Sequence, residues 1–312
     1  MNTSPSIDEL FEKRISYPDF EAQERLSKLV GLDDQISRLS KMLGLLVNSK
    51  GLENWAKKYH QGADQLVNMI LRRPPLIVLA GDVGSGKSEL AETIGDAVAR
   101  QENIDISLLP LSLSSRGQGR VGEMTQLISS AFEYAVSEAQ KLKSSSGASR
   151  GGIVLLVDEA DALAQSREAA QMHHEDRAGV NAFIRGIDRI ANGKLPAAVI
   201  MCTNRINALD PAIKRRAADI LTFGRPDKVQ RAAVLASPLK QLGFTQGQVE
   251  LLVDMTGAVK GRKYGFTFSD LTQRLIPAIV LDAYPHQAIT SNRALAVAQK
   301  IEPTPQFQDQ TI

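Results

Sequence analysis

The sequence predicts an α/β protein in which a parallel sheet is flanked by helices and followed by a small all-α domain. Three short apolar runs, at residues 76–80, 153–157 and 198–202, have the length and composition of buried strands. They alternate with segments of helical period, and this alternation favours a parallel sheet covered on both faces. No further strand-like run follows Gly224-Arg225-Pro226, so we expect only helices beyond that point.

The pattern along the chain predicts four parts. Residues 1–70 are a mostly amphipathic helical segment, residues 71–225 form the large α/β part, and residues 226–300 form a helical lid. Residues 301–312 are polar and contain proline, so we expect a flexible tail. The clearest helix of the α/β part repeats apolar residues at spacings of three and four within residues 124–136.

The composition is that of an ordinary globular protein. Its 312 residues include 37 Lys and Arg against 35 Asp and Glu, and a net charge of +2 gives no indication of a nucleic-acid or membrane surface. The single cysteine, Cys202, excludes an intrachain disulfide and fits a reducing compartment. No apolar run reaches the roughly 18 residues of a membrane span, and the charged N-terminus lacks the apolar core of a secretion signal. We therefore expect a cytoplasmic protein that does not associate with membranes.

The segment LAGDVGSGKSELAETIG, residues 79–95, contains a complete phosphate-binding loop. The loop and the residue after it are Gly81, Asp82, Val83, Gly84, Ser85, Gly86, Lys87, Ser88 and Glu89. They follow a predicted strand and open a predicted helix, as this mechanism requires. Glycines let backbone N–H groups turn toward the phosphates of ATP, Lys87 reaches the β and γ phosphates, and the Ser88 hydroxyl binds Mg²⁺. A glycine-rich turn that binds no nucleotide is the alternative, which the complete motif in this setting disfavours.

Two carboxylates follow the apolar strand in GGIVLLVDEAD. Asp158 and Glu159 are expected at the carboxyl edge of the sheet, where ligands of such sheets collect. Asp158 would bind Mg²⁺, and Glu159 would orient and deprotonate the water that attacks ATP. Alone, two such acids would more often be charges at a helix N-terminus. The phosphate-binding loop about 70 residues upstream favours the catalytic interpretation.

The third strand ends in VIMCTNR and leads to LDPAIKRRAAD. Asn204 emerges at the strand end, where its amide could hold the attacking water or the γ phosphate, although an Asn there is often only a turn residue. The pair Arg215-Arg216 could be a solvated face. Its other common use is a guanidinium presented to the γ phosphate of a neighbouring subunit.

The order of these motifs resembles that of the AAA+ ATPases, which have a P-loop NTPase fold. The phosphate-binding loop is followed by VDEAD, CTNR, LDPAIKRR and a helical lid with YGFTFSDL. More closely, SREAAQMHHEDRAGVNAFIRGID and RRAADILTFGRPDKVQRAAVLASPLKQL look like the pachytene-checkpoint (thyroid-receptor-interacting) ATPases that remodel HORMA-domain proteins. The resemblance covers residues 29–300. It implies a homo-hexameric ring with active sites at subunit interfaces.

The resemblance also implies roles for particular residues. Gly31 and Leu32 would lie near the adenine, Asn204 would be the polar sensor, and Arg215 or Arg216 would be the arginine finger. Family members carry a nucleotide-sensing arginine in a motif resembling FSDLTQRL, where this chain has Asp270 in one alignment and Arg274 a turn further on. Arg274 is therefore a candidate nucleotide-binding residue.

A loop facing the central pore grips the substrate in the family through an aromatic residue. The matching segment here is SSRGQGRVGEM, in which Arg120 occupies the aromatic position and Val121 follows. Arginine can still contact peptide carbonyls and acidic side chains, so we expect Arg120 and Val121 to grip a threaded polypeptide. The alternative is that Gly117 to Gly122 is only a turn.

These expectations combine into one function. The resemblance implies a compact bacterial ATPase that unfolds or disassembles a HORMA-domain protein, in antiphage signalling that also involves nucleotidyltransferases. A DNA-directed loader or helicase is one alternative, but the near-neutral charge counts against it. A module in which ATP only controls assembly is another, and Glu159 together with the pore segment argues against it.

Overall fold

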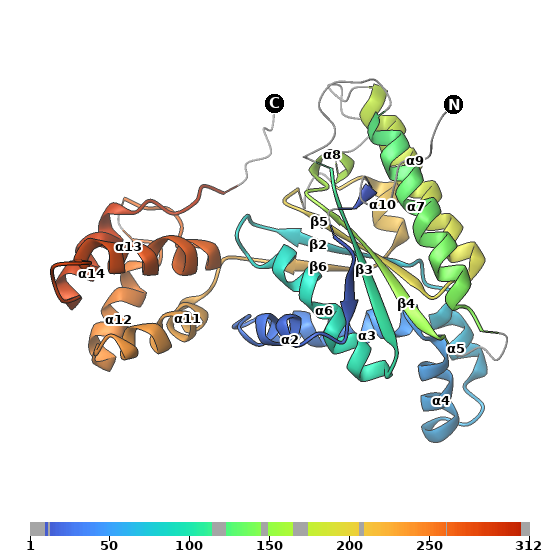
Figure 1. The fold of residues 1–312 in the computed structure, drawn as a ribbon, viewed down its shortest axis with the longest axis horizontal. Coiled ribbons are helices and arrows are strands. Elements are labelled where there is room, and N and C mark those ends of the chain that lie inside the picture. The colour runs from blue at the N-terminus through green and yellow to red at the C-terminus, as the bar shows by residue number, and fades with distance from the viewer. Residues whose placement is uncertain are drawn as a thin grey trace. The chain divides into compact units, whose positions relative to one another are not determined.

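The computed structural model describes residues 10–11, 13–113, 123–144, 149–164, 174–205, 209–259 and 261–306 (Figure 1). By packing, the chain divides into two compact units. The first contains Met1–Lys28, Asp34–Ala80 and Ser88–Thr222, and the second contains Leu29–Asp33, Gly81–Lys87 and Phe223–Ile312. Residues 29–33 and 81–87 belong to the same unit as the lid.

The first unit is built on a six-stranded sheet of strand order β1-β3-β4-β5-β2-β6. β3 pairs with β4, β4 with β5 and β5 with β2 in parallel, whereas β1 joins β3 antiparallel at one edge. The chain therefore passes from β2 over two strands to β3 and then returns through β4 to β5. The strands are β1 Ile15–Tyr17, β2 Leu76–Gly81, β3 Asp105–Ser112, β4 Gly151–Asp158, β5 Ala197–Thr203 and β6 Ala217–Phe223.

The three predicted strands are β2, β4 and β5, three of the four interior strands, while the sequence missed the others. Burial explains the difference. Every residue of β5 is buried, and in β2 and β4 every residue but the last is buried. A continuous apolar run is the signature of such strands. β6 is mostly half-buried, β3 is interrupted by Ser107 and Pro110, and β1 has three residues. None of these gives an uninterrupted apolar run.

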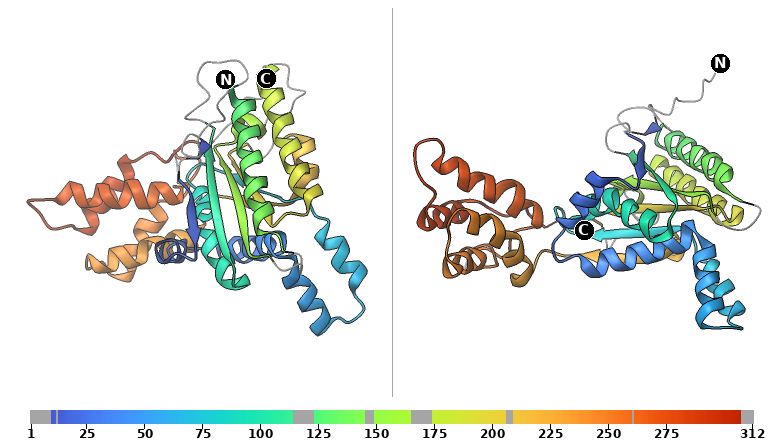
Figure 2. Two further views of the ribbon diagram at one scale, coloured as in Figure 1. Left: turned by 45° about the vertical axis from the view of Figure 1, so that its right-hand side comes forward. Right: turned by 60° about the horizontal axis from the view of Figure 1, so that its bottom comes forward.

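Helices cover both faces of the sheet. α7 and α9 lie side by side on one face (Figures 1 and 2). There the rings of Phe132 and Phe183 pack edge to face, with 5.6 Å between the ring centroids. α3 covers the other face, and Val47 packs against Gly152 of β4 so closely that a Cβ there would lie 2.7 Å from it. The helices of this unit are α2 Phe20–Ser27, α3 Asp33–Val47, α4 Ser49–Tyr59, α5 Asp64–Leu71, α6 Lys87–Glu102, α7 Glu123–Leu142, α8 Asp161–Ala164, α9 His174–Gly193 and α10 Pro211–Arg216.

The lid is helical, as predicted. Capping boxes start two of its helices, Asp227 with Gln230 at α11 and Thr245 with Gln248 at α12. Its helices are α11 Lys228–Gln241, α12 Gln246–Met255, the π-helix η1 Asp270–Leu275, α13 Ile276–Ala283 and α14 Ser291–Lys300. They enclose a separate apolar core of Leu235, Leu239, Phe244, Val249, Leu252, Val253, Phe266, Leu271, Leu275, Ile279, Ala294 and Ala298.

The start of the predicted tail is not loose. Thr304 donates its backbone N–H and its hydroxyl to Asp270, at 2.9 and 2.7 Å. Its carbonyl accepts a hydrogen bond from Arg225. The described chain therefore keeps its contacts with the lid at least as far as Thr304.

No helix in the described parts of the chain is long and apolar enough to cross a membrane.

Candidate functional site

The phosphate-binding loop joins the end of β2 to the start of α6, and its backbone demands glycine at three positions. Gly84 and Gly86 have φ angles of 69° and 94°, in the left-handed region that favours glycine. A Cβ on Gly81 would lie 1.9 Å from the carbonyl oxygen of Phe223. The spacing of glycines in the sequence is thus what this backbone requires.

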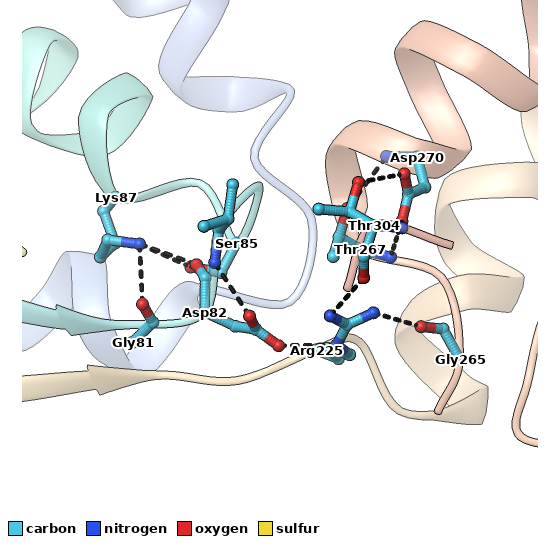
Figure 3. Close-up of polar contacts among 10 residues, drawn as sticks. Gly81, Asp82, Ser85, Lys87, Arg225, Gly265, Thr267, Asp270 and Thr304 are labelled. Carbon is cyan, nitrogen blue, oxygen red and sulfur yellow. Dashed lines mark hydrogen bonds and ion pairs between the residues drawn. The ribbon is translucent and has the colours of Figure 1, made fainter. Parts of the chain in front are cut away.

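Lys87 is buried, and its ammonium points into the loop. Its Nζ donates to the carbonyl oxygens of Gly81 and Asp82, at 3.1 and 2.7 Å (Figure 3). The hydroxyl of Ser85 lies 3.4 Å from Nζ and donates to the same Asp82 carbonyl. A buried cation inside a curl of glycines fits the phosphates of a nucleotide.

Gly31 and Leu32, predicted to lie near the adenine, pack with this loop in the second unit. A Cβ on Gly86 would lie 3.1 Å from Cδ1 of the buried Leu32. Gly31 has a φ of 74°, and its carbonyl accepts a hydrogen bond from Gln230 Nε2 at 2.7 Å. The structure therefore brings two of the predicted nucleotide-contacting segments together.

Two acidic residues predicted to bind the cofactor, Asp82 and Glu89, have protein partners for their carboxylates. The Asp82 carboxylate binds Arg225, with 2.6 Å between Oδ2 and Nε, and Val83 beside it is exposed. The Glu89 carboxylate receives both arms of Arg25 from α2, at 2.7 and 2.9 Å. Hydrogen bonds from Arg25 to Glu89 and Glu92 raise the pKa of this guanidinium above its ordinary value. Ser88, the predicted magnesium ligand, is exposed at the start of α6.

Asp158 is the last residue of β4, and Glu159 follows it in an unusual conformation. Glu159 has a φ of 51°, in the left-handed region that residues with a side chain rarely occupy. Its backbone N–H donates to Asp158 Oδ1 at 2.8 Å, and the next N–H, of Ala160, donates to the carbonyl of Cys202 in β5. Such a conformation costs free energy and concentrates at functional sites. It falls here on the carboxylate predicted to activate water.

Asn204 follows β5, the parallel neighbour of β4, so it lies at the same edge of the sheet as the two acids. Its backbone N–H and its Nδ2 donate to the two carboxylate oxygens of Asp161, at 2.7 and 3.1 Å. The Thr203 hydroxyl also donates to Asp161, at 2.8 Å. Sequence patterns did not reveal this role of Asp161, although the residue stands in DEAD two residues after Glu159.

The two candidate arginine fingers differ in their surroundings. Both arms of Arg216 bind Asp188 of α9, at 2.8 and 2.9 Å, and this contact raises the pKa of Arg216. Arg215 is exposed. It forms no ion pair with any residue that the structure describes.

In the lid, Arg274 Nη1 binds the buried Asp270 at 2.7 Å, and about half of the Arg274 side chain is exposed. Asp270 itself is committed to its neighbours Thr267 and Thr304. Arg120 and Val121, the predicted pore loop, lie outside the described residues.

Comparison with known proteins places these motifs in context. Residues 77–225 match the family described as "ATPase family associated with various cellular activities (AAA)". The chain is 67% identical over 309 residues to CD-NTase-associated protein 6 of Escherichia coli (strain MS 115-1), covering 99% of both chains. It is 33% identical over 305 residues to a protein of the same name from E. coli (strain KTE188), covering 97% of this chain and 99% of that protein.

Solved structures of similar chains have the same fold. A chain in the structure of the E. coli MS115-1 HORMA:CdnC:Trip13 complex superposes with a TM-score of 0.90 and 66% identity, over 98% of this chain and 100% of that chain. Rhizobiales Trip13 gives a TM-score of 0.73 and 59% identity over 95% of this chain and 99% of that chain. The FIGL-1 AAA domain in complex with ADP gives 0.63 at 18% identity, over 97% of this chain and 91% of that chain, which shows a shared fold.

Proposed function

The chain belongs to the family of AAA ATPases that includes CD-NTase-associated protein 6, and from this membership we propose that it is a hexameric remodelling ATPase acting on a HORMA-domain protein. It hydrolyses ATP and uses the energy to unfold or disassemble this partner, which also binds a nucleotidyltransferase in bacterial antiphage signalling. The observation that carries the proposal is the full-length likeness to a chain of the HORMA:CdnC:Trip13 complex. A cytoplasmic location, expected from the sequence, stays a prediction.

The roles of the site residues follow from their chemistry. The N–H groups of the phosphate-binding loop and the Lys87 ammonium would hold the phosphates of ATP. Ser88 and Asp158 would hold Mg²⁺, which supplies charge neutralisation on the phosphates when bound. Glu159 would accept the proton of the attacking water. Asn204, whose Nδ2 donates one hydrogen bond to Asp161, would orient that water through its Oδ1.

Arg215 is the better candidate for a finger that acts on the neighbouring subunit. The side chain of an arginine finger must be free to extend from its own subunit and contact the phosphate bound to the neighbouring subunit. Arg216 would first have to give up two charge-assisted hydrogen bonds to Asp188, whereas Arg215 is exposed. Arg274, half exposed and anchored at one arm, is proposed to sense the nucleotide. Arg120 and Val121 are proposed to grip the partner in the pore.

The proposal is tested on a preassembled complex of a HORMA-domain protein and its nucleotidyltransferase, followed by size-exclusion chromatography. With ATP, the wild-type protein should separate the two partners. The Glu159→Gln protein should bind the complex and co-elute with it without separating the partners, because ATP is held and not hydrolysed. Partners that stay together while the wild-type protein hydrolyses ATP would contradict the remodelling function, and stimulation by DNA alone would favour the loader.

A further inference from the structure

Arg225, in the connection between β6 and α11, contacts three separate segments. Nε donates to Asp82 Oδ2 at 2.6 Å, Nη1 to the Gly265 carbonyl at 2.7 Å, and Nη2 to the Thr304 carbonyl at 2.6 Å (Figure 3). The guanidinium also lies 4.5 Å from the centre of the Tyr264 ring. Only 10% of the side chain is exposed. Each of the three guanidinium nitrogens thus has an acceptor, as a buried guanidinium requires.

One of these segments is the phosphate-binding loop. The Asp82 carboxylate that binds Arg225 through Oδ2 also accepts the backbone N–H of Val83 through Oδ1, at 3.0 Å. The carbonyl of the same residue accepts hydrogen bonds from Lys87 and Ser85. Fixing Asp82 therefore fixes the peptide group on which the internal hydrogen bonds of the loop converge.

A second segment is the C-terminal stretch around Thr304. This residue accepts a hydrogen bond from Arg225 and donates two to the buried Asp270. Asp270 also accepts the backbone N–H of Thr267 at 3.0 Å, and Ser269 of the same turn donates its N–H to the Gly84 carbonyl at 3.1 Å. Within the second unit, Arg225 and Ser269 thus hold the phosphate-binding loop at Asp82 and at Gly84, and Thr304 is hydrogen-bonded to both Arg225 and Asp270.

We propose that Arg225 is a positioning residue for the bound nucleotide, and that Thr304 completes this clamp on the phosphate-binding loop. The inference rests on the proposed role of residues 81–88 in binding phosphate. A clamped loop presents its N–H groups to the phosphates without first having to order itself, so the clamp raises nucleotide affinity. It touches no reacting atom, so the rate at saturating ATP depends little on it.

The principal test is Arg225→Lys, which keeps the positive charge and loses the three-armed geometry. We expect the Kd for fluorescent mant-ADP and the KM for ATP to rise about tenfold, the scale of a lost charge-assisted hydrogen bond, with kcat within about threefold of wild type. Arg231→Lys is the matched control. That half-buried lid arginine donates to the carbonyls of Pro226 and Val253 and not to the loop, so its Kd and KM should be unchanged.

Two further variants keep the inference testable if Arg225→Lys folds poorly. Asp82→Asn removes the other half of the ion pair and should raise the Kd by a similar factor. Thr304→Ala removes the hydroxyl bonded to Asp270 but keeps the carbonyl that binds Arg225, so a smaller rise is expected. The double variant Arg225→Lys, Asp82→Asn should show less than the product of the two single effects, because the residues act as a pair.

The Lys87→Ala variant distinguishes an error in the positioning role of Arg225 from an error in the phosphate-binding role of residues 81–88. If Lys87→Ala loses mant-ADP binding while Arg225→Lys and Asp82→Asn bind it as the wild type does, the positioning role is wrong. If Lys87→Ala still binds with wild-type affinity, the phosphate-binding assignment itself fails. A loss of kcat without a change of Kd or KM would also overturn the inference, since a positioning residue acts on binding here.

Discussion

Asn204 is anchored to Asp161 through two hydrogen bonds, from its backbone N–H at 2.7 Å and from its side-chain Nδ2 at 3.1 Å. The amide is thereby oriented, with its Oδ1 directed away from the carboxylate. Asp161 thus sets the geometry of Asn204, the polar residue proposed to orient the attacking water. Asp161 is a positioning residue in this arrangement, because it acts through Asn204.

Replacement of Asp161 by Ala should lower kcat about tenfold or more and leave the KM for ATP nearly unchanged, since Asn204 loses its anchor while the phosphate-binding loop is intact. Steady-state ATPase kinetics give both constants. Asp105→Ala is the control, because Asp105 is exposed at the opposite end of β3 from this edge of the sheet. Unchanged kcat in Asp161→Ala would show that Asn204 needs no anchor or takes no part.

The left-handed backbone of Glu159 predicts a separation of stability from activity. Glu159→Gly should raise the free energy of unfolding by up to about 1 kcal/mol, because glycine adopts this φ without strain, and should abolish hydrolysis. Lys194→Gly is the matched control, since Lys194 has a φ of 47° in an exposed turn. It should bring a similar gain in stability with full activity. A less stable Glu159→Gly protein would mean that the side chain makes stabilising contacts that offset the strain.

The phosphate-binding loop and the catalytic acid should fail in different ways. Lys87→Ala should abolish nucleotide binding, because it removes the buried cation of the loop. Glu159→Gln should bind ATP normally and stop turnover, since only the proton acceptor is lost. Binding of mant-ATP and release of phosphate measure the two steps. Loss of binding in both variants would contradict the role given to Glu159.

The contacts of the two arginines predict that only one acts in trans. Arg215→Ala should stop hydrolysis with no loss of stability, and mixing it with Glu159→Gln subunits should restore part of the activity, because some interfaces then contain both an intact acid and an intact finger. Arg216→Ala should lower the free energy of unfolding, because Asp188 loses its partner. The loss should be about 1 kcal/mol or less at this partly exposed pair. ATPase assays of mixed rings and urea unfolding measure these effects. Restoration by Arg216→Ala and not by Arg215→Ala would reverse the assignment.

The sequence predicted the parts of the molecule in which local chemistry dictates local structure. The glycines of the phosphate-binding loop and the apolar runs of β2, β4 and β5 carry their own signatures. Contacts between distant residues leave no such pattern. The spacing of residues in the sequence could not predict the ion pair of Arg25 with Glu89. The same holds for the ion pair of Arg225 with Asp82, which lie 143 residues apart. The backbone strain at Glu159 could not be predicted either, because no sequence pattern indicates that a glutamate adopts a left-handed φ.

The hydrogen bonds of the C-terminal segment likewise leave no pattern in the sequence. A polar segment with two prolines has the composition of a loose tail, yet Thr304 is held by Arg225 and Asp270, which lie 79 and 34 residues earlier in the chain. Composition describes what a segment can do alone. Here the segment is held by two residues, Arg225 as hydrogen-bond donor and Asp270 as acceptor.

Asp270 predicts how the lid responds to acid. Burial alone would raise the pKa of this carboxyl, but hydrogen bonds from Thr267, Thr304 and Arg274 outweigh burial and hold its pKa below the ordinary value of 3.8. A carboxyl whose pKa is lower in the folded state contributes stability above its unfolded pKa and loses it as the pH falls through the folded pKa. The contribution is therefore complete at neutral pH and decreases below about pH 4.

Asp270→Asn should lower the free energy of unfolding at pH 7 by about 1–3 kcal/mol, because an amide satisfies these donors less well and leaves a buried polar group without partners. The loss should shrink as the pH falls below about 4, where the wild-type carboxyl gains a proton in the unfolded state before it does so in the folded state. Urea unfolding monitored by circular dichroism at several pH values measures both. Asp282→Asn is the control, since Asp282 is partly exposed and paired with Arg293, and should cost about 1 kcal/mol or less. Equal losses for the two variants at pH 7 would show that the buried hydrogen bonds of Asp270 add nothing beyond a surface ion pair.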